Sequence, residues 1–492
     1  MSHIRIGKGV IAFPDIFYPV RIFPALLVII LGLCYSLTIA PDLTWAHFSA
    51  DGGDFISAAA TGGVPHPSGY PLYLIIARSF QFLPFGTLAF RTNLLSACCT
   101  ILCALLLYVY ISSQLGKRAW AEQAAFLGAL SYGLSPFVWG QALVTEVYAL
   151  HGLLLMLCLH TLNIEHPRIS EGLRGCLFGI AASNHITAML MFPLLAMRAD
   201  GKLLSSKSVY IQRGIGVVVG LSLYFSLPIR AYFSPPINWG NPSTLEGFWG
   251  LISGQLYLPY LSSLSLADVI QRLRAFSGLL LDQFTWAGVI FGLYGLISSP
   301  PRRLLIQTGW MGMAFLSFSL FYGTNDSQVY LLPFWLAFAT WLAHGVQDVF
   351  LWLPNRHRLQ VYLTIVLFIA LMIRIPFLFP IVDASEDQRA QDFIAKAVQV
   401  IPANALVFVD GDEQIFSLWY VQFAQHQRMD MVIVANGLLP YAWYPENLRH
   451  TYPTLDVPKI NNLLPSELIA ANASREICNI SRNVSIICTK NR

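Results

Sequence analysis

Two aspartates, Asp51 and Asp54, stand in the short run Asp-Gly-Gly-Asp-Phe, and His66 follows in a His-Pro-Ser-Gly-Tyr-Pro turn that also holds Tyr70. Carboxylates and imidazoles are the side chains that most often move protons in catalysis. On a helix that begins near Asp51, the two carboxylates would lie on one face. Asp51 also suits a helix N-cap and Asp54 a first helical turn, so helix capping is the alternative. A rigid turn that holds one histidine beside two acids is more than capping requires, and it favours a functional site.

A second group of polar and aromatic residues begins near position 230. Such a mixture suits a carbohydrate, because a sugar presents C–H faces to aromatic rings and hydroxyl groups to amides. An interfacial amphipathic segment with an aromatic belt is the alternative. Asp326, in a Gly-Thr-Asn-Asp turn, adds a further acid, whereas Asp410, Asp412 and Glu413 favour a helix N-terminus. The members of the mixed group are Asn238, Trp239, Asn241, Glu246, Trp249, Gln255, Tyr257 and Tyr260.

The composition places these residues in a membrane protein. The chain has 492 residues, of which 55% are hydrophobic and only 11% charged, against roughly 25% charged in an ordinary soluble chain. Apolar stretches of about 20 residues recur, and each is long enough to cross a hydrocarbon core. The net charge of +4 is too small to indicate a nucleic-acid partner. The sequence therefore predicts an all-α polytopic membrane domain and excludes a soluble globule.

Nine apolar stretches predict membrane-spanning helices, and a tenth, 175–197, is interrupted at Ser-Asn-His. We expect this tenth stretch to enter and return as a broken hairpin, which gives about nine to eleven helices in all. Irregular backbone at membrane depth is tolerated where protein or water surrounds it. His185, at the interruption, is therefore expected to line a cavity, with a packing role as the alternative. The nine spans are 22–40, 92–113, 121–139, 146–163, 212–229, 278–298, 304–322, 329–346 and 360–382.

The distribution of Lys and Arg predicts the orientation, because cationic loops are retained on the cytoplasmic side. With a cytoplasmic N-terminus, segments 41–91, 230–277 and 383–492 face the periplasm, the cell exterior or a lumen. The first apolar segment is expected to stay as a helix rather than to be cleaved as a signal peptide. The cytoplasmic set is Arg5, Lys8, Arg21, Lys117, Arg118, Arg168, Arg174, Arg198, Lys202, Lys207, Arg213, Arg302, Arg303, Arg356 and Arg358, against only Arg78, Arg91, Arg230, Arg272 and Arg274 in the outer loops.

The tail is predicted to be a separate outward-facing α/β domain, so we divide the chain into a membrane domain, 1–382, and a tail domain, 383–492. The tail pattern gives the β-α-β spacing of a small α/β fold. Cys478 and Cys488 favour a local disulfide in an oxidising compartment. The predicted elements of the tail are a helix at 392–401, a strand at 405–410, a helix at 413–425 and a strand at 431–435.

The motifs resemble those of glycosyltransferase family 117, which is related to protein O-mannosyltransferases and to transmembrane protein 260. The resemblance covers about residues 22–350, and its most specific elements are the two motifs around Asp51 and His66 and the one at 238–242. Members of the family commonly have Glu where this chain has Asp54, and often Pro where it has Ser68. The other matching elements are 141–151, 184–187 and 227–230.

The resemblance implies a GT-C glycosyltransferase that takes a hexose, expected to be mannose, from a polyprenyl- or dolichyl-phosphate sugar on the outer membrane face. The expected acceptor is a hydroxyl group, in first place that of a protein Ser or Thr. In such a reaction a carboxylate takes the proton of the hydroxyl, and we expect either Asp51 or Asp54 to be this base. The resemblance also raises Glu146 and Tyr148 as sugar or acceptor contacts, although a capping acid would explain Glu146 alone.

Arginines are expected to stabilise the leaving phosphate, because a guanidinium group matches phosphate oxygens bidentately. We nominate Arg230 and Arg374, which lie at the outer end of one predicted span and within another. Snorkelling to lipid headgroups is the alternative for arginines near helix ends. Arg78 and Arg91 are weaker candidates with an interfacial character.

No cofactor is expected besides the lipid-linked donor. No His/Cys cluster has the spacing of metal ligands, although Asp51, Asp54 and His66 could together hold a divalent ion. The expected partners are the lipid bilayer, the donor lipid and an acceptor protein or glycan. A transporter or flippase of lipid-linked sugars is the main alternative function, and a non-catalytic scaffold is a third. Acids gathered at one face, rather than at the membrane midplane, favour the enzyme.

Overall fold

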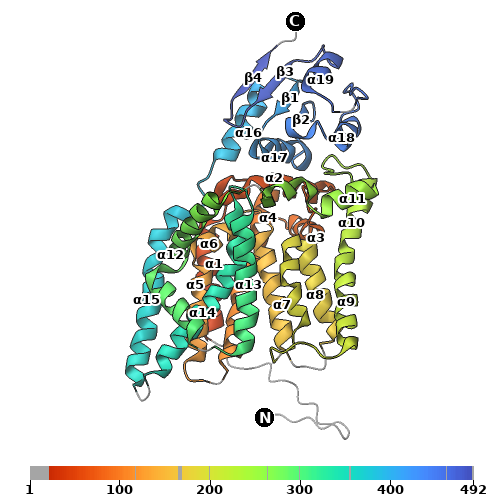
Figure 1. The fold of residues 1–492 in the computed structure, drawn as a ribbon. Coiled ribbons are helices and arrows are strands. Elements are labelled where there is room, and N and C mark those ends of the chain that lie inside the picture. The colour runs from red at the N-terminus through yellow and green to blue at the C-terminus, as the bar shows by residue number, and fades with distance from the viewer. Residues whose placement is uncertain are drawn as a thin grey trace, which may run out of the picture.

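The computed structural model of the chain describes residues 22–489 apart from 117, 165–168, 199, 263, 299, 354–355 and 461. The molecule has two parts, a body of long helices and a smaller module that contains a β-sheet and lies at one end of the body (Figure 1). Of the basic residues used to predict the orientation, Arg5, Lys8, Arg21, Lys117 and Arg168 lie outside the described residues.

The helical body runs from residue 22 to residue 382. Its α-helices are α1 (Ile22–Thr38), α2 (Gly52–Thr61), α3 (Pro71–Gln81), α4 (Leu88–Leu115), α5 (Ala121–Gly133), α6 (Pro136–Ala142), α7 (Tyr148–Asn163), α8 (Glu171–Asn184), α9 (Lys207–Leu221), α10 (Ser226–Tyr232), α11 (Leu245–Ile252), α12 (Leu266–Ile297), α13 (Arg302–Phe321), α14 (Leu332–Leu351) and α15 (His357–Val382). Short 3-10 segments connect them: η1 (Ala46–Asp51), η2 (Ile186–Ala196), η3 (Ser222–Phe225), η4 (Gln255–Ser262) and η5 (Ser327–Leu331).

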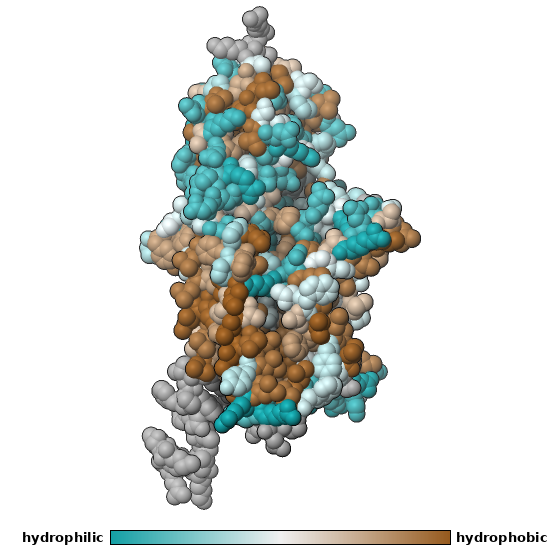
Figure 2. Space-filling view, turned by 90° about the vertical axis from the view of Figure 1, so that its left-hand side faces the viewer, coloured by the Kyte–Doolittle hydropathy of each residue, from teal (hydrophilic) through white to brown (hydrophobic). Residues whose placement is uncertain are grey.

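The body has the character of a membrane protein. Six helical stretches are long and apolar enough to cross a bilayer: Leu88–Leu115, Lys207–Tyr232, Leu266–Ile297, Arg302–Phe321, Ser327–Leu351 and His357–Val382. The predicted spans 22–40 and 146–163 correspond to shorter apolar helices, α1 and α7. Apolar residues form a brown band on the body in Figure 2, below the mainly teal module. The predicted polytopic helical fold is thereby confirmed.

One predicted span, 121–139, is wrong as a single helix. α5 ends at Gly133 and α6 begins at Pro136. Proline lacks the N–H that would continue the helix, and it pushes the preceding residue out of the helical region. Ser135 accordingly has an extended backbone, with ψ at 133°.

The broken hairpin at 175–197 is present. α8 ends at Asn184, His185 is extended with φ −150° and ψ 127°, and η2 continues the chain beyond it. α8 and α9 pack with their backbones almost in contact, because small residues allow such an approach. A Cβ added at Gly175 or Gly216 would lie 1.9 Å or 2.0 Å from a backbone oxygen of the facing helix.

The three segments predicted to share one side of the membrane do meet at one end of the body. α2 and α3 of segment 41–91, and α11 of segment 230–277, lie at the end that carries the C-terminal module (Figure 1). The beginnings of α9, α13 and α15, with Lys207, Arg302 and Arg358, lie at the opposite end. The arrangement therefore agrees with the predicted alternation, and which compartment each end faces stays a prediction.

The C-terminal module is a small α/β fold, as predicted. Its four-stranded sheet has the order β2-β1-β3-β4, with β1 parallel to both β2 and β3, and β3 antiparallel to β4. All residues of β1 and β2 are buried, as expected for parallel strands. The elements are α16 (Arg389–Val400), β1 (Leu406–Val409), α17 (Asp412–Trp419), the π-helical η6 (Tyr420–Ala424), β2 (Val432–Ala435), η7 (Asn436–Leu438), α18 (Trp443–Thr451), α19 (Pro465–Ala471), β3 (Ile477–Ile480) and β4 (Ile486–Thr489).

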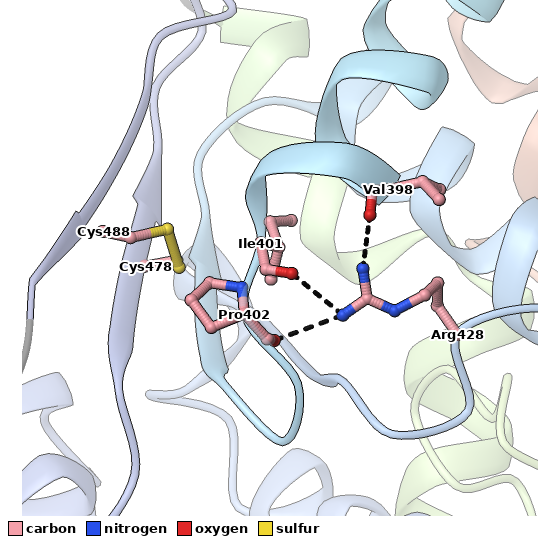
Figure 3. Close-up of a disulfide and its surroundings, with 6 residues drawn as sticks. All are labelled: Val398, Ile401, Pro402, Arg428, Cys478 and Cys488. Atoms are coloured by element: carbon pink, nitrogen blue, oxygen red, sulfur yellow. Dashed lines mark hydrogen bonds between the residues drawn. A yellow bond between two sulfur atoms is a disulfide. The ribbon is translucent and has the colours of Figure 1, made fainter.

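Two local devices hold the module together (Figure 3). The predicted disulfide is present, and it joins Cys478 of β3 to Cys488 opposite it in β4. The second device is the Arg428 guanidinium, which donates to the backbone oxygens of Val398 and Ile401 at the C-terminal end of α16. Carbonyl groups at a helix C-terminus lack intrahelical partners, so this arginine satisfies them.

Polar and aromatic contacts fix the module on the body. The Thr44 hydroxyl donates to Asp387 (2.5 Å), and the Trp45 indole N–H donates to the Ser417 hydroxyl (3.1 Å). At Gly53 the two parts approach so closely that a Cβ would lie 2.3 Å from the backbone oxygen of Phe416. α17 of the module therefore lies directly on α2, which carries the first acidic motif.

Candidate active site

Two acids and one histidine form a cluster of connected side chains at the interface between the body and the module. Asp54, in the first turn of α2, is fully buried, and its Oδ2 accepts the backbone N–H of His66 (2.9 Å) and the Nδ1–H of the same residue (2.8 Å). The other ring nitrogen, Nε2, lies 3.5 Å from Oδ2 of Asp51 and 3.1 Å from the Tyr70 hydroxyl. The structure thus brings together the acids, the histidine and the tyrosine that the motif predicted.

Asp51 and Asp54 differ in what surrounds them. Asp54 also accepts the indole N–H of Trp239 (3.3 Å), so all its contacts are internal. The Asp51 side chain is 35% exposed, and it forms no capping hydrogen bond although it stands at the N-cap of α2. The two acids thus occupy the N-cap and first-turn positions of the capping alternative, but Asp51 does not make the hydrogen bond by which a cap acts. Asp51 is the carboxylate that a substrate could reach.

The surroundings of the cluster raise the pKa values of both Asp51 and His66, for different reasons. Burial raises the pKa of Asp51 to about 6, with Asp412 and Asp54 adding to the rise and His66 opposing it. Burial by itself lowers the pKa of His66, but the attraction of Asp51 and the hydrogen bond to Asp54 raise it to about 9. At neutral pH the site therefore holds an imidazolium between two carboxylates, and one carboxylate has a pKa suited to a general base.

A ring of aromatic side chains lies next to the cluster. His185, at the break of the hairpin, has the rings of Tyr70, Tyr148 and Tyr330 each 5.7 Å from its own ring, centroid to centroid. Its Nδ1 lies 2.8 Å from the Thr187 hydroxyl. The structure thus brings His185 and Tyr148, as predicted, to the same site as Tyr70.

His151 and Glu146 lie nearby but differ in their polar contacts. His151 is buried, and its Nε2 lies 3.3 Å from the Thr187 hydroxyl, whereas its Nδ1 has no hydrogen-bond partner among the described residues. Glu146, just before α7, is also buried, and its Oε1 has no hydrogen-bond partner among the described residues. An unpartnered carboxylate oxygen at this depth leaves an acceptor available for a substrate hydroxyl.

The outer loop after α10 closes one side of the site. Asn238 and Trp239 follow Ile237, which pairs with the first motif through a backbone hydrogen bond from Val64 (2.8 Å). Asp326 and Tyr257 lie within electrostatic range of Asp51, and burial together with Asp51 raises the pKa of the Tyr257 phenol. The loop and the turn before η5 therefore contribute to the same surface, as the sequence predicted.

The module contributes residues that the sequence analysis did not place in the site. The Phe416 ring of α17 stacks on the His66 ring, with centroids 6.5 Å apart and planes within 18°. Burial, together with Asp54 and Asp326, raises the pKa of Asp412, whereas His66 and Arg482 lower it. The sequence pattern correctly placed Asp412 at a helix N-terminus, but no pattern links it to a motif so far back in the chain.

Two arginines, Arg230 and Arg78, lie near each other without acidic partners among the described residues. Arg230, in the last turn of α10, donates to the backbone oxygen of Gly63 (3.4 Å), and Arg78 lies close enough to interact with it electrostatically. Arg78, on α3, lies over the Phe82 ring at 4.8 Å. Within the described ranges neither arginine has an ion pair. Two like charges in proximity are costly, and a dianionic or monoanionic phosphate between them would relieve that cost.

Arg374 is not brought into this group. Its guanidinium donates to the backbone oxygens of Asp282 and Gln283, where α12 is interrupted at Thr285 (φ 60°). A break in a helix leaves carbonyl groups unpaired, and the arginine satisfies them. Arg91 is similarly engaged, with backbone oxygens of the loop before α4. The structure therefore gives both arginines a structural role.

No group of three or more His, Cys, Asp and Glu side chains has the geometry of a metal site in the part of the chain that the structure describes. Asp51, Asp54 and His66 do lie together, but the ring nitrogens of His66 face the two carboxylates. The expectation that the chain needs no metal stays a prediction.

Two families of domains match the chain. Residues 51–202 match the family described as the Protein O-mannosyl-transferase TMEM260 N-terminal domain, and residues 390–466 match TMEM260-associated domain 2. The first match contains the acidic motif and the broken hairpin, and the second contains most of the C-terminal module. The resemblance that the motifs indicated is thereby confirmed.

Curated relatives agree with these matches. The chain is 24% identical over 485 residues to Protein O-mannosyl-transferase TMEM260 of Mus musculus, covering 89% of this chain and 66% of the relative. It is 23% identical to Protein O-mannosyl-transferase tmem260 of Dictyostelium discoideum, covering 85% of this chain and 58% of the relative. The chain thus spans about two thirds or less of the length of these relatives.

Solved structures show the same fold at low sequence identity. ArnT from Cupriavidus metallidurans, bound to undecaprenyl phosphate, superposes with a TM-score of 0.58 and 11% identity over 94% of this chain and 92% of its own. The Archaeoglobus fulgidus oligosaccharyltransferase superposes with a TM-score of 0.51 and 10% identity over 95% of this chain and 73% of its own. The chain therefore has the GT-C fold.

Proposed function

We propose that this chain, a GT-C protein of the TMEM260-like family, is a membrane glycosyltransferase. In this proposal it transfers a hexose, in first place mannose, from a polyprenyl- or dolichyl-phosphate sugar to a hydroxyl group of a protein Ser or Thr. The names of the curated relatives support the acceptor and the sugar, and the lipid bound to ArnT supports a polyprenyl phosphate. The reaction is placed at the end of the body that carries the C-terminal module.

One observation carries the proposal. The Asp51 carboxylate is partly exposed and lies beside the imidazolium of His66, and the buried carboxylate of Asp54 holds that imidazolium by a hydrogen bond. Asp51 is assigned as the base, because it alone of the two acids is open to a substrate. Asp54 is assigned as a positioning residue, because its oxygens hold His66 and Trp239. The positive charge of His66 keeps Asp51 ionised near neutral pH in spite of its burial.

The assigned groups account for each bond that changes. The acceptor oxygen forms a bond to the anomeric carbon, and its proton passes to Asp51. The bond between the anomeric carbon and the phosphate oxygen breaks, and the electron pair leaves with the lipid phosphate. Arg230 and Arg78, which lie near each other, are proposed to stabilise the added negative charge of that phosphate. Glu146 and Tyr148 are proposed contacts of the sugar.

The proposal is tested with the purified full chain in nanodiscs, supplied with polyprenyl-phosphate mannose, glucose or galactose and a panel of folded proteins rich in Ser and Thr. We expect release of polyprenyl phosphate and a hexose mass added to Ser or Thr of an acceptor, with mannose used best. As a control, the variant Arg274→Ala, at an exposed arginine of the same end of the body, should react like the unchanged chain. Saturable donor binding without release under any acceptor condition would contradict the enzyme and favour a carrier of lipid-linked sugars.

A further inference from the structure

A groove lies between the outer loop and the C-terminal module. Its volume is about 220 Å³, and one wall is segment 231–243 while the other is α18. Segment 231–243, which forms one wall, directly follows Arg230 in the sequence and contains Trp239. Both residues were described above with the candidate site. Its polar lining includes Ser234, Asn238, Ser243, Glu446, Asn447 and His450.

The groove adjoins the proposed catalytic centre through one wall of aromatic rings. The Trp443 ring lines the groove and lies 5.9 Å from the Trp239 ring, centroid to centroid. The other side of that wall belongs to the cluster, because the Trp239 indole N–H donates to Asp54. A molecule in the groove that contacts Trp443 would therefore be separated from the buried carboxylate by two aromatic side chains, Trp443 and Trp239.

Two side chains of the groove are buried but not fully satisfied. Asn238 is 6% exposed and Asn447 8% exposed, and the Oδ1 atoms of both have no hydrogen-bond partner among the described residues. The Asn447 amide N–H donates to the backbone oxygen of Pro236 (2.9 Å), so this residue joins the two walls. Buried polar groups in proteins are normally paired, which makes two such amides in one groove indicative of a ligand.

The lining suits an extended peptide. Side-chain amides and hydroxyl groups can both donate and accept, as the N–H and C=O groups of a peptide backbone require. The one carboxylate of the set, Glu446, is already paired with Arg449 (2.6 Å), so the groove offers little free charge. An extended strand turns successive side chains to opposite sides, so the backbone of a peptide could run between the two walls.

We propose that this groove binds the polypeptide acceptor by its backbone, next to the hydroxyl group that is glycosylated. The inference rests on the proposed function and names its acceptor as an extended protein segment. It also gives the module a task, because α18 supplies one wall of the groove. Recognition through backbone groups predicts little dependence on the neighbouring side chains of the acceptor.

The test is photo-crosslinking of a synthetic peptide to the full chain in nanodiscs. The peptide has one threonine among alanines and glycines and a benzophenone side chain three residues away. We expect labelling within 231–243 or 443–450, and at least tenfold less labelling in the variants Ser243→Trp and His450→Trp, which fill the groove from opposite walls. The matched control is Ser474→Trp, an exposed serine elsewhere on the module, and it should label like the unchanged chain.

Two results would overturn the inference. The first is that both groove-filling variants are labelled as strongly as the unchanged chain. The second is that an excess of methyl mannoside prevents the labelling whereas an excess of unlabelled peptide does not. The second result would identify a sugar site instead. Labelling needs no turnover, so the experiment tests peptide binding in the groove separately from the proposed reaction. Labelling elsewhere by a chain that transfers hexose overturns the groove alone, whereas labelling in the groove without release of lipid phosphate supports the groove and contradicts the enzyme.

Discussion

At the scale of single residues, the cluster explains how a carboxylate next to a membrane can act near neutral pH. Burial disfavours the charge on Asp51, whereas the adjacent His66 favours it, and the balance raises the pKa of Asp51 to about 6. Asp54 holds the imidazole through Nδ1, so the other ring nitrogen faces Asp51. Two acids of the same type thus have different surroundings, on which their different proposed roles depend.

The pH dependence of kcat/KM follows from these two groups. Asp51 must be ionised to accept a proton, so activity should fall as the pH is lowered through about 6. His66 should lose its proton as the pH rises through about 9, and activity should fall there too. In His66→Gln the alkaline limb should disappear, and the acid limb should move to higher pH because the charge that lowers the pKa of Asp51 is gone. An unchanged acid limb in this variant would contradict the coupling.

The paired arginines predict a loss of donor binding. Arg230→Ala and Arg78→Ala should each weaken binding of the lipid-phosphate donor by about ten- to a hundredfold, the range for a lost charge-assisted hydrogen bond of about 1.5–3 kcal/mol. Arg230→Lys should recover part of the affinity, because lysine keeps the charge but not the bidentate geometry. Donor affinity is measured by equilibrium binding in nanodiscs, with Arg274→Ala as the control. Equal affinity in all four variants would show that the phosphate binds elsewhere.

Sequence motifs could predict which site residues lie close together when these residues are near one another in the chain or near a helix break. They could not predict contacts between residues that are far apart in the sequence. The Asp51, Asp54 and His66 set is held by α2 and the turn that follows it, so its members lie within one short stretch of the sequence. Arg374 was nominated from its height along a helix, but its direction depends on the break in α12 at Thr285. Asp412 was missed because its place depends on how the module lies on the body.

At the scale of elements, the contact of α17 with α2 joins the module to the catalytic motif. Phe416 of α17 covers His66, and the backbone of the same residue leaves no room for a side chain at Gly53. α2 follows Asp51 directly, so any shift of α17 would be felt by the base.

Gly53→Ala tests this contact. The added Cβ would lie 2.3 Å from the Phe416 oxygen, and forcing extra atoms into a packed interface costs about 1–3 kcal/mol. We expect faster amide hydrogen exchange in α17 and a strong loss of transfer activity. Gly32→Ala is the matched control, because a Cβ at that position of α1 meets no other atom within 4 Å. Unchanged exchange in α17 of Gly53→Ala would contradict the described contact.

The elements themselves could be predicted where their periodicity was clear. The first two helices and two strands of the module agree with the sequence pattern to within a few residues, apart from the division of the second helix into α17 and η6. β3 and β4 were not predicted, because each strand has just four residues; only the disulfide that joins them was. The break between α5 and α6 was overlooked because the hydropathy stays high across Pro136.

At the scale of the whole molecule, several cations at helix beginnings lie at the end opposite to the acidic cluster of the candidate site. Lys207, Arg302 and Arg358 begin helices at the end away from the module, and the acidic cluster lies under the module (Figure 1). Cationic loops are retained in the cytoplasm. The site is therefore expected to face the other compartment, where the sugar of a translocated lipid donor would be.

Cysteine accessibility in intact cells checks this orientation. Ser474→Cys on the module should react with a membrane-impermeant thiol reagent, and Arg358→Cys at the beginning of α15 should react only after the membrane is opened. Both positions are exposed in the structure, and the unchanged chain supplies the background from its own cysteines. The reverse pattern would place the site in the cytoplasm and contradict a donor that presents its sugar outside.

The central claim, that Asp51 is the base and Asp54 its positioning partner, is tested most directly by single-turnover release of lipid phosphate under saturating donor and acceptor. Asp51→Asn should bind the donor normally and lose about a hundred- to ten-thousandfold in rate, the usual contribution of a general base. Asp54→Asn should keep a measurable rate with an altered pH profile, because His66 loses its anchor. Full activity of Asp51→Asn, or a greater loss in Asp54→Asn without any change of pH profile, would contradict the account.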